Sequence, residues 1–233
     1  MNQYNAYLYS HDGQDYANDK WDYGLLKEIF DKYEVDQTRV TEIPKADKAF
    51  VVIPGPQTAG NEELLSNELN KLSRVVLFIN GDENARFDVS KIRHNNIEIW
   101  IQYPHEKHDQ YNKMPIGVPQ HLKDNVPEYK EKEYDVYFGG QITHSRRKEL
   151  ASVMPRLKNS LYGPTKGFSL GDKPKDYYAK LSSAKIAPCP SGAAVIDTFR
   201  FFEAIEMLAL PIGDLVDSKG EMIDYFNFCE REG

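Results

Sequence analysis

The chain has 233 residues, 40% of them hydrophobic, and a formal net charge of -7. This length supports one large or two modest globular domains with buried cores, and the composition excludes a disordered chain. The acidic balance excludes non-specific adhesion to nucleic acid as the main function, although a net figure does not exclude a local basic cleft.

No apolar run approaches the roughly 20 residues that span a bilayer. The start of the sequence carries neither a basic leader nor an apolar signal core. The only cysteines, Cys189 and Cys229, have neither metal-ligand nor Cys-x-x-Cys spacing, so we expect no disulfide framework and no zinc site. These features predict a soluble, cytoplasmic protein without a membrane span.

In the first half, short apolar runs alternate with helical periodicity, which is typical of parallel strands joined by crossover helices. Strands are expected at Asn5–Tyr9, Ala49–Ile53, Val75–Asn80 and Ile97–Tyr103. Apolar stripes predict helices between them, with these members: Leu25, Leu26, Ile29 and Phe30 in one, and Leu64, Leu65, Leu69 and Leu72 in another. Asn61 precedes the second stripe as its expected N-cap.

The stretch from Val118 to Asp135 is polar, charged and interrupted by prolines, which is typical of a linker. After it the alternation restarts. Strands are expected at Tyr134–Phe138, near Leu161, at Lys185–Pro188 and at Leu210–Ile212, and helices near Ser145, around Tyr177–Leu181 and at Thr198–Leu208. We therefore predict an α/β domain over residues 1–120, a linker over 121–133 and a second α/β domain over 134–233.

A helix start follows a small-residue loop in the stretch SGAAVIDTFRFFEAIEMLALPIGD, residues 191–214. Asp197 or Thr198 is the expected N-cap, so free backbone N–H groups and the positive end of the helix dipole favour an anion. Arg200 adds planar donors suited to phosphate oxygens. Glu203 repels a phosphate but accepts hydrogen bonds from ribose or sugar hydroxyls. The pattern indicates a nucleoside diphosphate site; a surface Arg/Glu pair beside a cap is the alternative.

A glycine pair follows the strand expected at Tyr134–Phe138. Gly139 and Gly140 let the backbone approach a ligand closely, and the basic run from Arg146 to Lys148 at the next helix start can neutralise phosphates. Alone, this pattern is more typical of a turn followed by solvated basic residues. Combined with the helix that carries Arg200, it favours a phosphate site in the second half of the chain.

Three stretches, FGG…HSRRKEL, YYAKLSSAKIAPCPSG and DTFRFFEAIEMLALPIGD, occur in this order. In sequence and spacing they resemble the donor-binding half of exostosin-like glycosyltransferases, which have the two-domain fold called GT-B. The resemblance covers about Tyr134–Asp214. The family's Pro-x-Gly loop, Phe-Arg-x-x-Glu-Ala helix and small apolar strand correspond to Pro190–Gly192, Phe199–Ala204 and Leu210–Ile212.

The resemblance implies the fold and the donor site. Two Rossmann-like domains would face each other across a cleft, with an acceptor-side domain first, a donor-binding domain second and a C-terminal part shorter than usual. Arg200 would contact the donor diphosphate, Glu203 the ribose, and Arg146 the phosphates or leaving group. The other donor-site residues expected are Gly139, Gly140, Ser191, Gly192 and Thr198. The resemblance also implies an inverting transfer.

An inverting transfer needs a general base on the acceptor hydroxyl. His11 and Asp12 follow the first strand, so they are the first candidates, and Asp82 and Glu83 occupy the equivalent position after the strand at Val75–Asn80. Ordinary turn chemistry is the alternative for both pairs. The histidines of YPHEKHDQY, His105 and His108, lack an i,i+4 pair or a third ligand, so this stretch is interpreted as a polar loop rather than a metal site.

These observations predict a glycosyltransferase that moves a sugar from a nucleotide-diphosphate sugar, with a UDP-sugar as the expected donor, to a hydroxyl acceptor. The acceptor could be a glycan, a small metabolite or a hydroxylated nucleobase. A nucleotide-sugar epimerase of the same fold and a non-catalytic nucleotide-sugar-binding module are the alternatives. No Asp-x-Asp occurs in the chain, so no metal and no further cofactor is expected. The sequence leaves the oligomeric state open.

Overall fold

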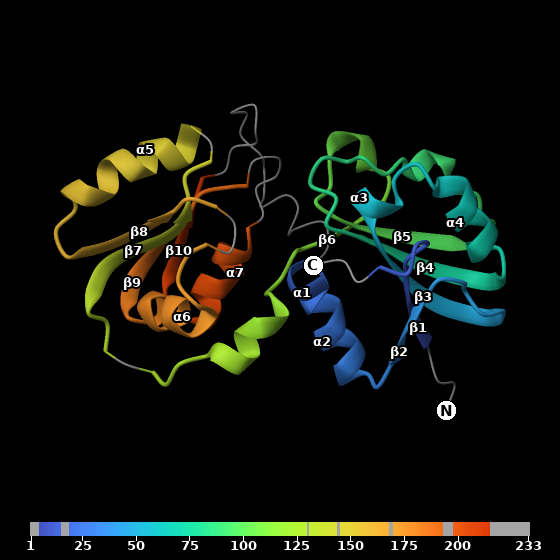
Figure 1. Cartoon of the computed structure of the whole chain (residues 1–233), viewed down its shortest axis with the longest axis horizontal. Coiled ribbons are helices and arrows are strands. Elements are labelled where there is room, and N and C mark those ends of the chain that lie inside the picture. The colour runs from blue at the N-terminus through green and yellow to red at the C-terminus, as the bar shows by residue number, and fades with distance from the viewer. Residues whose placement is uncertain are drawn as a thin grey trace. The chain divides into compact units, whose positions relative to one another are not determined.

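A computed structural model describes residues 5–14, 19–129, 131–143, 145–167, 170–192 and 198–214 (Figure 1). The chain forms two compact units, Met1–Gln120 and His121–Gly233. Each unit contains one parallel sheet with helices, so the α/β class predicted from the sequence is confirmed. No helix within the described ranges is long and apolar enough to cross a membrane.

The first unit is built on a six-stranded sheet of order β2-β1-β3-β4-β5-β6. Every neighbouring pair is parallel. The strands are β1 (Asn5–Tyr9), β2 (Asp36–Val40), β3 (Ala46–Pro54), β4 (Leu72–Asn80), β5 (Ile97–Gln102) and β6 (Asn112–Met114). The helices are α1 (Asp19–Asp22), α2 (Gly24–Lys32), α3 (Gly55–Thr58) and α4 (Glu62–Leu69), with 3-10 turns η1 (Val89–Lys91), η2 (Glu106–His108) and η3 (Gln120–Asn125).

Helices cover both faces of this sheet (Figure 1). On one face Leu26 and Phe30 of α2 pack with Val52 of β3. On the other face Leu65 and Leu69 of α4 belong to the core cluster that contains the neighbouring strand residues Val51 and Ile53. Because successive strand residues are buried on opposite faces, β3 is a continuous apolar run rather than an alternating one, as expected for a buried parallel strand.

The central strands contain the residues predicted for them, except that β5 ends at Gln102 and leaves out Tyr103. The strands at the two sheet edges, β2 and β6, were not predicted. The sequence of β2, DQTRV, has no fully buried position, and β6 has three residues. Edge strands bury little apolar surface, so they lack the apolar run that marks a strand in a sequence.

The second unit has a four-stranded parallel sheet of order β10-β9-β7-β8. The strands are β7 (Tyr134–Gln141), β8 (Ser160–Thr165), β9 (Ala184–Cys189) and β10 (Leu210–Gly213). The helices are α5 (Ser145–Val153), α6 (Pro174–Ser182) and α7 (Phe199–Glu206), with the 3-10 turn η4 (Met154–Arg156). All seven regular elements predicted for this half are present within the described residues.

Each sheet reverses its strand order once. In the first unit β1 lies between β2 and β3, and in the second unit β7 lies between β8 and β9. In each unit the chain therefore runs from the first strand to a neighbouring strand on one side, and then crosses to a strand on the other side of the first. Open parallel sheets bind ligands outside the carboxyl ends of the strands at such a switch point, so each unit has one predicted binding position.

Candidate functional site

In the second unit, Arg200 of α7 lies against the glycine pair at the end of β7. Its Nη2 donates to the Gly139 carbonyl oxygen, and its guanidinium carbon lies 4.7 Å from the ring centroid of Phe138. Gly140 has a φ of +151°, and a Cβ at this position would collide with the Arg200 guanidinium. The absence of a side chain at Gly140 thus provides the room that Arg200 occupies at the switch point.

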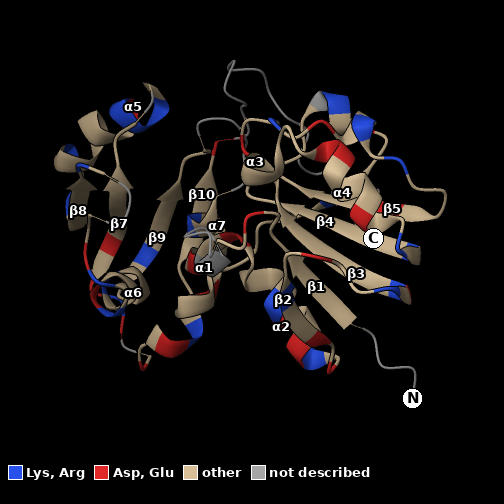
Figure 2. Cartoon of the chain, turned by 45° about the vertical axis from the view of Figure 1, so that its right-hand side comes forward, with Lys and Arg blue, Asp and Glu red and all other residues tan. Residues whose placement is uncertain are grey.

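Arg146, at the start of α5, contacts two further segments at the same sheet edge. Its Nη2 donates to the Gly192 carbonyl oxygen at 3.0 Å, and its Nε lies 2.9 Å from Asp214 Oδ2. Asp214 Oδ1 also accepts from the backbone N–H and hydroxyl of Ser191, at 2.5 and 2.7 Å. Arg146 thus connects the start of α5 to the segments that follow β9 and β10. Figure 2 shows the Lys and Arg positions of α5.

Glu203 is buried beneath Arg200 on α7, with 5% of its surface exposed. Its carboxylate accepts hydrogen bonds from the hydroxyls of Tyr177, at 3.0 Å, and Tyr178, at 2.8 Å, both on α6. Burial raises the pKa of Glu203, while the tyrosine hydroxyls and Arg200 oppose this shift. The Glu203 carboxylate oxygens, which the sequence predicts to bind a ribose, thus accept hydrogen bonds from tyrosine hydroxyls of the protein in this structure. A contact of Glu203 with a ribose stays a prediction.

The environment of Arg200 keeps it charged. Burial acts to lower its pKa, but Tyr177 and Glu203 raise it, and the net shift is upward. The neighbouring tyrosine pair was not identified as a site feature from the sequence. Its only signal there is a Tyr-Tyr dipeptide on a helix, which is equally typical of a core-facing stripe.

Thr198 occupies the N-cap position of α7, as predicted. Its backbone is extended, with φ -135° and ψ 143°, and its side chain makes no capping hydrogen bond. Thr198 Oγ1 is buried and has no hydrogen-bond partner among the described residues. Asp197, the other expected N-cap, lies outside the described residues. A buried hydroxyl that the described residues leave without a partner, two positions before Arg200 in the chain, is consistent with a ligand-binding role.

The first base candidates, His11 and Asp12, follow the carboxyl end of β1. His11 Nε2 lies 3.5 Å from Asn61 Nδ2. Asp12 is exposed, and its Oδ1 accepts from the Ser10 hydroxyl at 2.8 Å and from the Gln14 backbone N–H at 3.1 Å. The contacts of Asp12 are those of a turn, and the catalytic role of either residue stays a prediction.

Asp82, the alternative base, follows β4 at the same edge of the sheet and is buried. Its two carboxylate oxygens accept the backbone N–H groups of Arg86, at 2.9 Å, and Phe87, at 2.8 Å. Its neighbour Glu83 is exposed, and the Glu83 carbonyl oxygen lies 2.9 Å from His105 Nε2. These contacts give Asp82 a structural role in the turn after β4, and a catalytic role for it stays a prediction.

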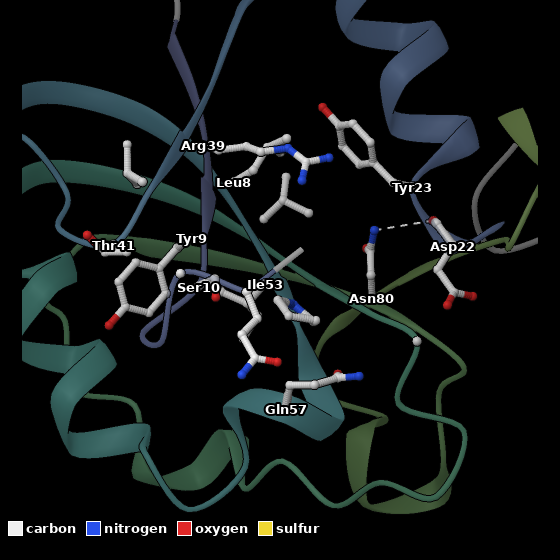
Figure 3. A pocket seen from close by; sticks show the side chains of 16 residues that line it. Leu8, Tyr9, Ser10, Asp22, Tyr23, Arg39, Thr41, Ile53, Gln57 and Asn80 are labelled. Carbon is white, nitrogen blue, oxygen red and sulfur yellow. Dashed lines mark hydrogen bonds between the residues drawn. The ribbon is translucent and has the colours of Figure 1, made fainter. Parts of the chain in front are cut away.

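A cavity of about 250 Å³ opens at the carboxyl ends of β1, β3 and β4 in the first unit (Figure 3). Ser10 and Gly13 line it, but none of the base candidates, His11, Asp12, Asp82 and Glu83, does. The cavity coincides with the switch point between β1 and β3. Sequence reasoning missed it because its walls come from segments that are far apart in the chain.

Across the described ranges, no group of three or more His, Cys, Asp and Glu side chains is arranged to hold a metal ion. No protein-family model matches the chain, and a search of curated proteins finds no significant match.

Proposed function

We propose that the protein is a glycosyltransferase that moves a sugar from a nucleotide-diphosphate sugar to a hydroxyl acceptor. The observation that supports this proposal best is the contact of Arg200 with the glycine pair Gly139–Gly140 at the carboxyl end of β7. Arg146 lies at the ends of β9 and β10, on the same edge of this sheet. Two guanidinium groups, a glycine pair and a hydroxyl for which the described residues supply no partner suit a diphosphate, since phosphate oxygens accept several charge-assisted hydrogen bonds.

In the proposed reaction, the acceptor hydroxyl oxygen attacks the anomeric carbon of the donor sugar. The bond from that carbon to the diphosphate oxygen breaks, and the acceptor proton passes to a base, for which His11 and Asp12 are the first candidates. The nucleoside diphosphate leaves with the bonding electron pair. Arg200 and Arg146 stabilise the negative charge that develops on the leaving diphosphate. Hydrogen-bond donors held in position before the reaction stabilise such charge most effectively.

The donor site is tested by calorimetry with UDP, GDP, CDP, ADP and dTDP. Arg200→Ala should weaken binding of the preferred nucleotide by about 1.5–3 kcal/mol, the typical contribution of a hydrogen bond to a charged group. Thr198→Val keeps the side-chain shape and removes only the hydroxyl, so we expect a smaller loss of about 0.5–1.5 kcal/mol. The matched control is Arg156→Ala, because Arg156 is exposed in η4, which precedes β8, away from the strands' carboxyl ends.

Circular dichroism of each variant separates lost binding from lost structure, because Arg200 also contacts Phe138 and Gly139. If no nucleotide binds, or if folded Arg200→Ala and Thr198→Val both bind as tightly as the wild type, the donor-site assignment is wrong.

The reaction class needs a separate measurement. Transfer releases nucleoside diphosphate only when an acceptor is present. A nucleotide-sugar epimerase would instead interconvert donor sugars without that release, and a binding module would do neither. Transfer is also expected to persist in EDTA, because Arg146 and Arg200 are assigned the leaving-group charge. Loss of transfer in EDTA and its recovery with Mn²⁺ would contradict that assignment.

A further inference from the structure

The cavity at the β1/β3 switch point contains two buried acceptor atoms for which the described residues supply no donor. They are Asn80 Oδ1 at the end of β4 and Gln57 Oε1 on α3. Figure 3 shows both side chains among those that line the cavity. Leaving a buried acceptor without a hydrogen bond costs about 1–3 kcal/mol, so such atoms indicate a ligand or bound solvent.

The orientation of the Asn80 amide is fixed by its neighbours. Asn80 Nδ2 donates to the Asp22 carbonyl oxygen at 3.2 Å, and Gln102 Nε2 donates to the same oxygen at 3.0 Å. Rotating the Asn80 amide by half a turn would place two acceptor oxygens against each other. The Asn80 side-chain oxygen is therefore the amide atom for which the described residues supply no donor, and Asn80 is 5% exposed.

The charges around the cavity are balanced. Its lining includes one basic side chain, Arg39, and one acidic side chain, Asp22, whose Oδ1 accepts the Tyr103 hydroxyl at 2.9 Å. A phosphate or carboxylate is bound by an excess of positive charge, which the lining residues that the structure describes do not provide. The lining therefore favours a neutral ligand.

The remaining walls combine polar and apolar groups. Leu8, Val52 and Ile53 supply aliphatic surface, and Ser10 and Thr41 supply hydroxyls. A cavity of about 250 Å³ has the volume of roughly eight water molecules in the liquid, which suits a molecule with a single ring. A sugar ring presents hydroxyl donors at its edge and C–H groups on its faces, and mixed linings of this kind bind such molecules.

We propose that the first unit binds a neutral, polyhydroxylated molecule of monosaccharide size in this cavity, with its hydroxyls donating to Asn80 Oδ1 and Gln57 Oε1. The cavity alone supports this assignment. If the proposed function also holds, the bound molecule, or the terminal ring of a larger one, is the acceptor of the transferred sugar.

The test is saturation-transfer NMR on the full chain without nucleotide, using glucose, galactose, mannose, N-acetylglucosamine, xylose and myo-inositol as probes. At least one probe should bind with a dissociation constant on the order of 1 mM, as is usual for a ligand this small. Gln57→Leu removes one acceptor and should weaken binding about 3- to 10-fold. Asn80→Leu should weaken it similarly, and Gln110→Leu, at an exposed position outside the lining, should not change it.

Failure of every probe to bind the folded protein overturns the proposal, and so does binding that Gln57→Leu leaves unchanged in a folded variant. Loss of UDP binding in Gln57→Leu would also overturn it, because the cavity would then hold a nucleotide. The two proposals fail separately: sugar binding reports on the cavity of the first unit, and the response of nucleotide binding to Arg200→Ala reports on the second.

Discussion

Single side chains at the carboxyl edge of the first sheet hold their turns in place, and Asp82 is the clearest case. Asp82→Ala removes the acceptors for the Arg86 and Phe87 N–H groups and should lower the free energy of unfolding by about 1–3 kcal/mol. Asp82→Asn retains one acceptor oxygen and should lower the free energy of unfolding by less. Urea denaturation measures both, with exposed Asn84→Ala as the control. A loss in activity without a loss in stability would instead support Asp82 as the base.

At the residue scale, His108 should make the stability depend on pH. Burial, with smaller contributions from Lys107 and His105, lowers its pKa from 6.5 to about 4, while Asp82 and Asp109 oppose this shift. The folded protein therefore favours the neutral ring. The stability it contributes is present above pH 6.5 and is lost as the pH falls through 4.

The free energy of unfolding of the wild type, measured in urea between pH 7 and pH 4, should thus fall more steeply than that of His108→Gln. Parallel curves for the two proteins would show that protonation of His108 is not coupled to unfolding.

At the scale of elements, the end of β7 and the start of α7 must fit together around Arg200. Gly140→Ala places a methyl group where the guanidinium lies and forces a side chain into a backbone conformation with φ of +151°. We expect it to weaken nucleotide binding at least as much as Thr198→Val. Gly163→Ala is the matched control, because a Cβ at Gly163, on neighbouring β8, meets no atom within 4 Å. Equal nucleotide affinities for the two variants would show that Arg200 does not bind the donor.

At the scale of the whole molecule, the chain divides into units with separate sheets. The aromatic and aliphatic clusters around Phe30 and Leu77 lie entirely within residues 1–120, so this fragment contains the core it needs to fold alone. We expect fragment 1–120 to unfold in one cooperative transition in urea and to retain the cavity at the β1/β3 switch point. A fragment that shows no cooperative transition, or the circular dichroism of a disordered chain, would contradict this.

The sequence by itself determined the elements that bury apolar surface. The limits of β1 were predicted to the residue, Asn61 was placed correctly as an N-cap, and Thr198 is one of the two N-caps expected for α7. Apolar periodicity and capping are local properties of the chain. β2 was missed because its residues are mostly exposed at the sheet edge.

Only the tertiary structure decided which side chains meet. The contact of Arg200 with Gly139 joins residues 61 positions apart, and the sequence showed both motifs without showing that they touch. The two hydroxyls on Glu203 come from another helix, and the cavity around Asn80 collects residues from several strand ends. Parallel sheets bring the carboxyl ends of distant strands to one edge, so the surroundings of a site residue depend on strand order. Strand order is a property of the folded chain, which no local pattern in the sequence specifies.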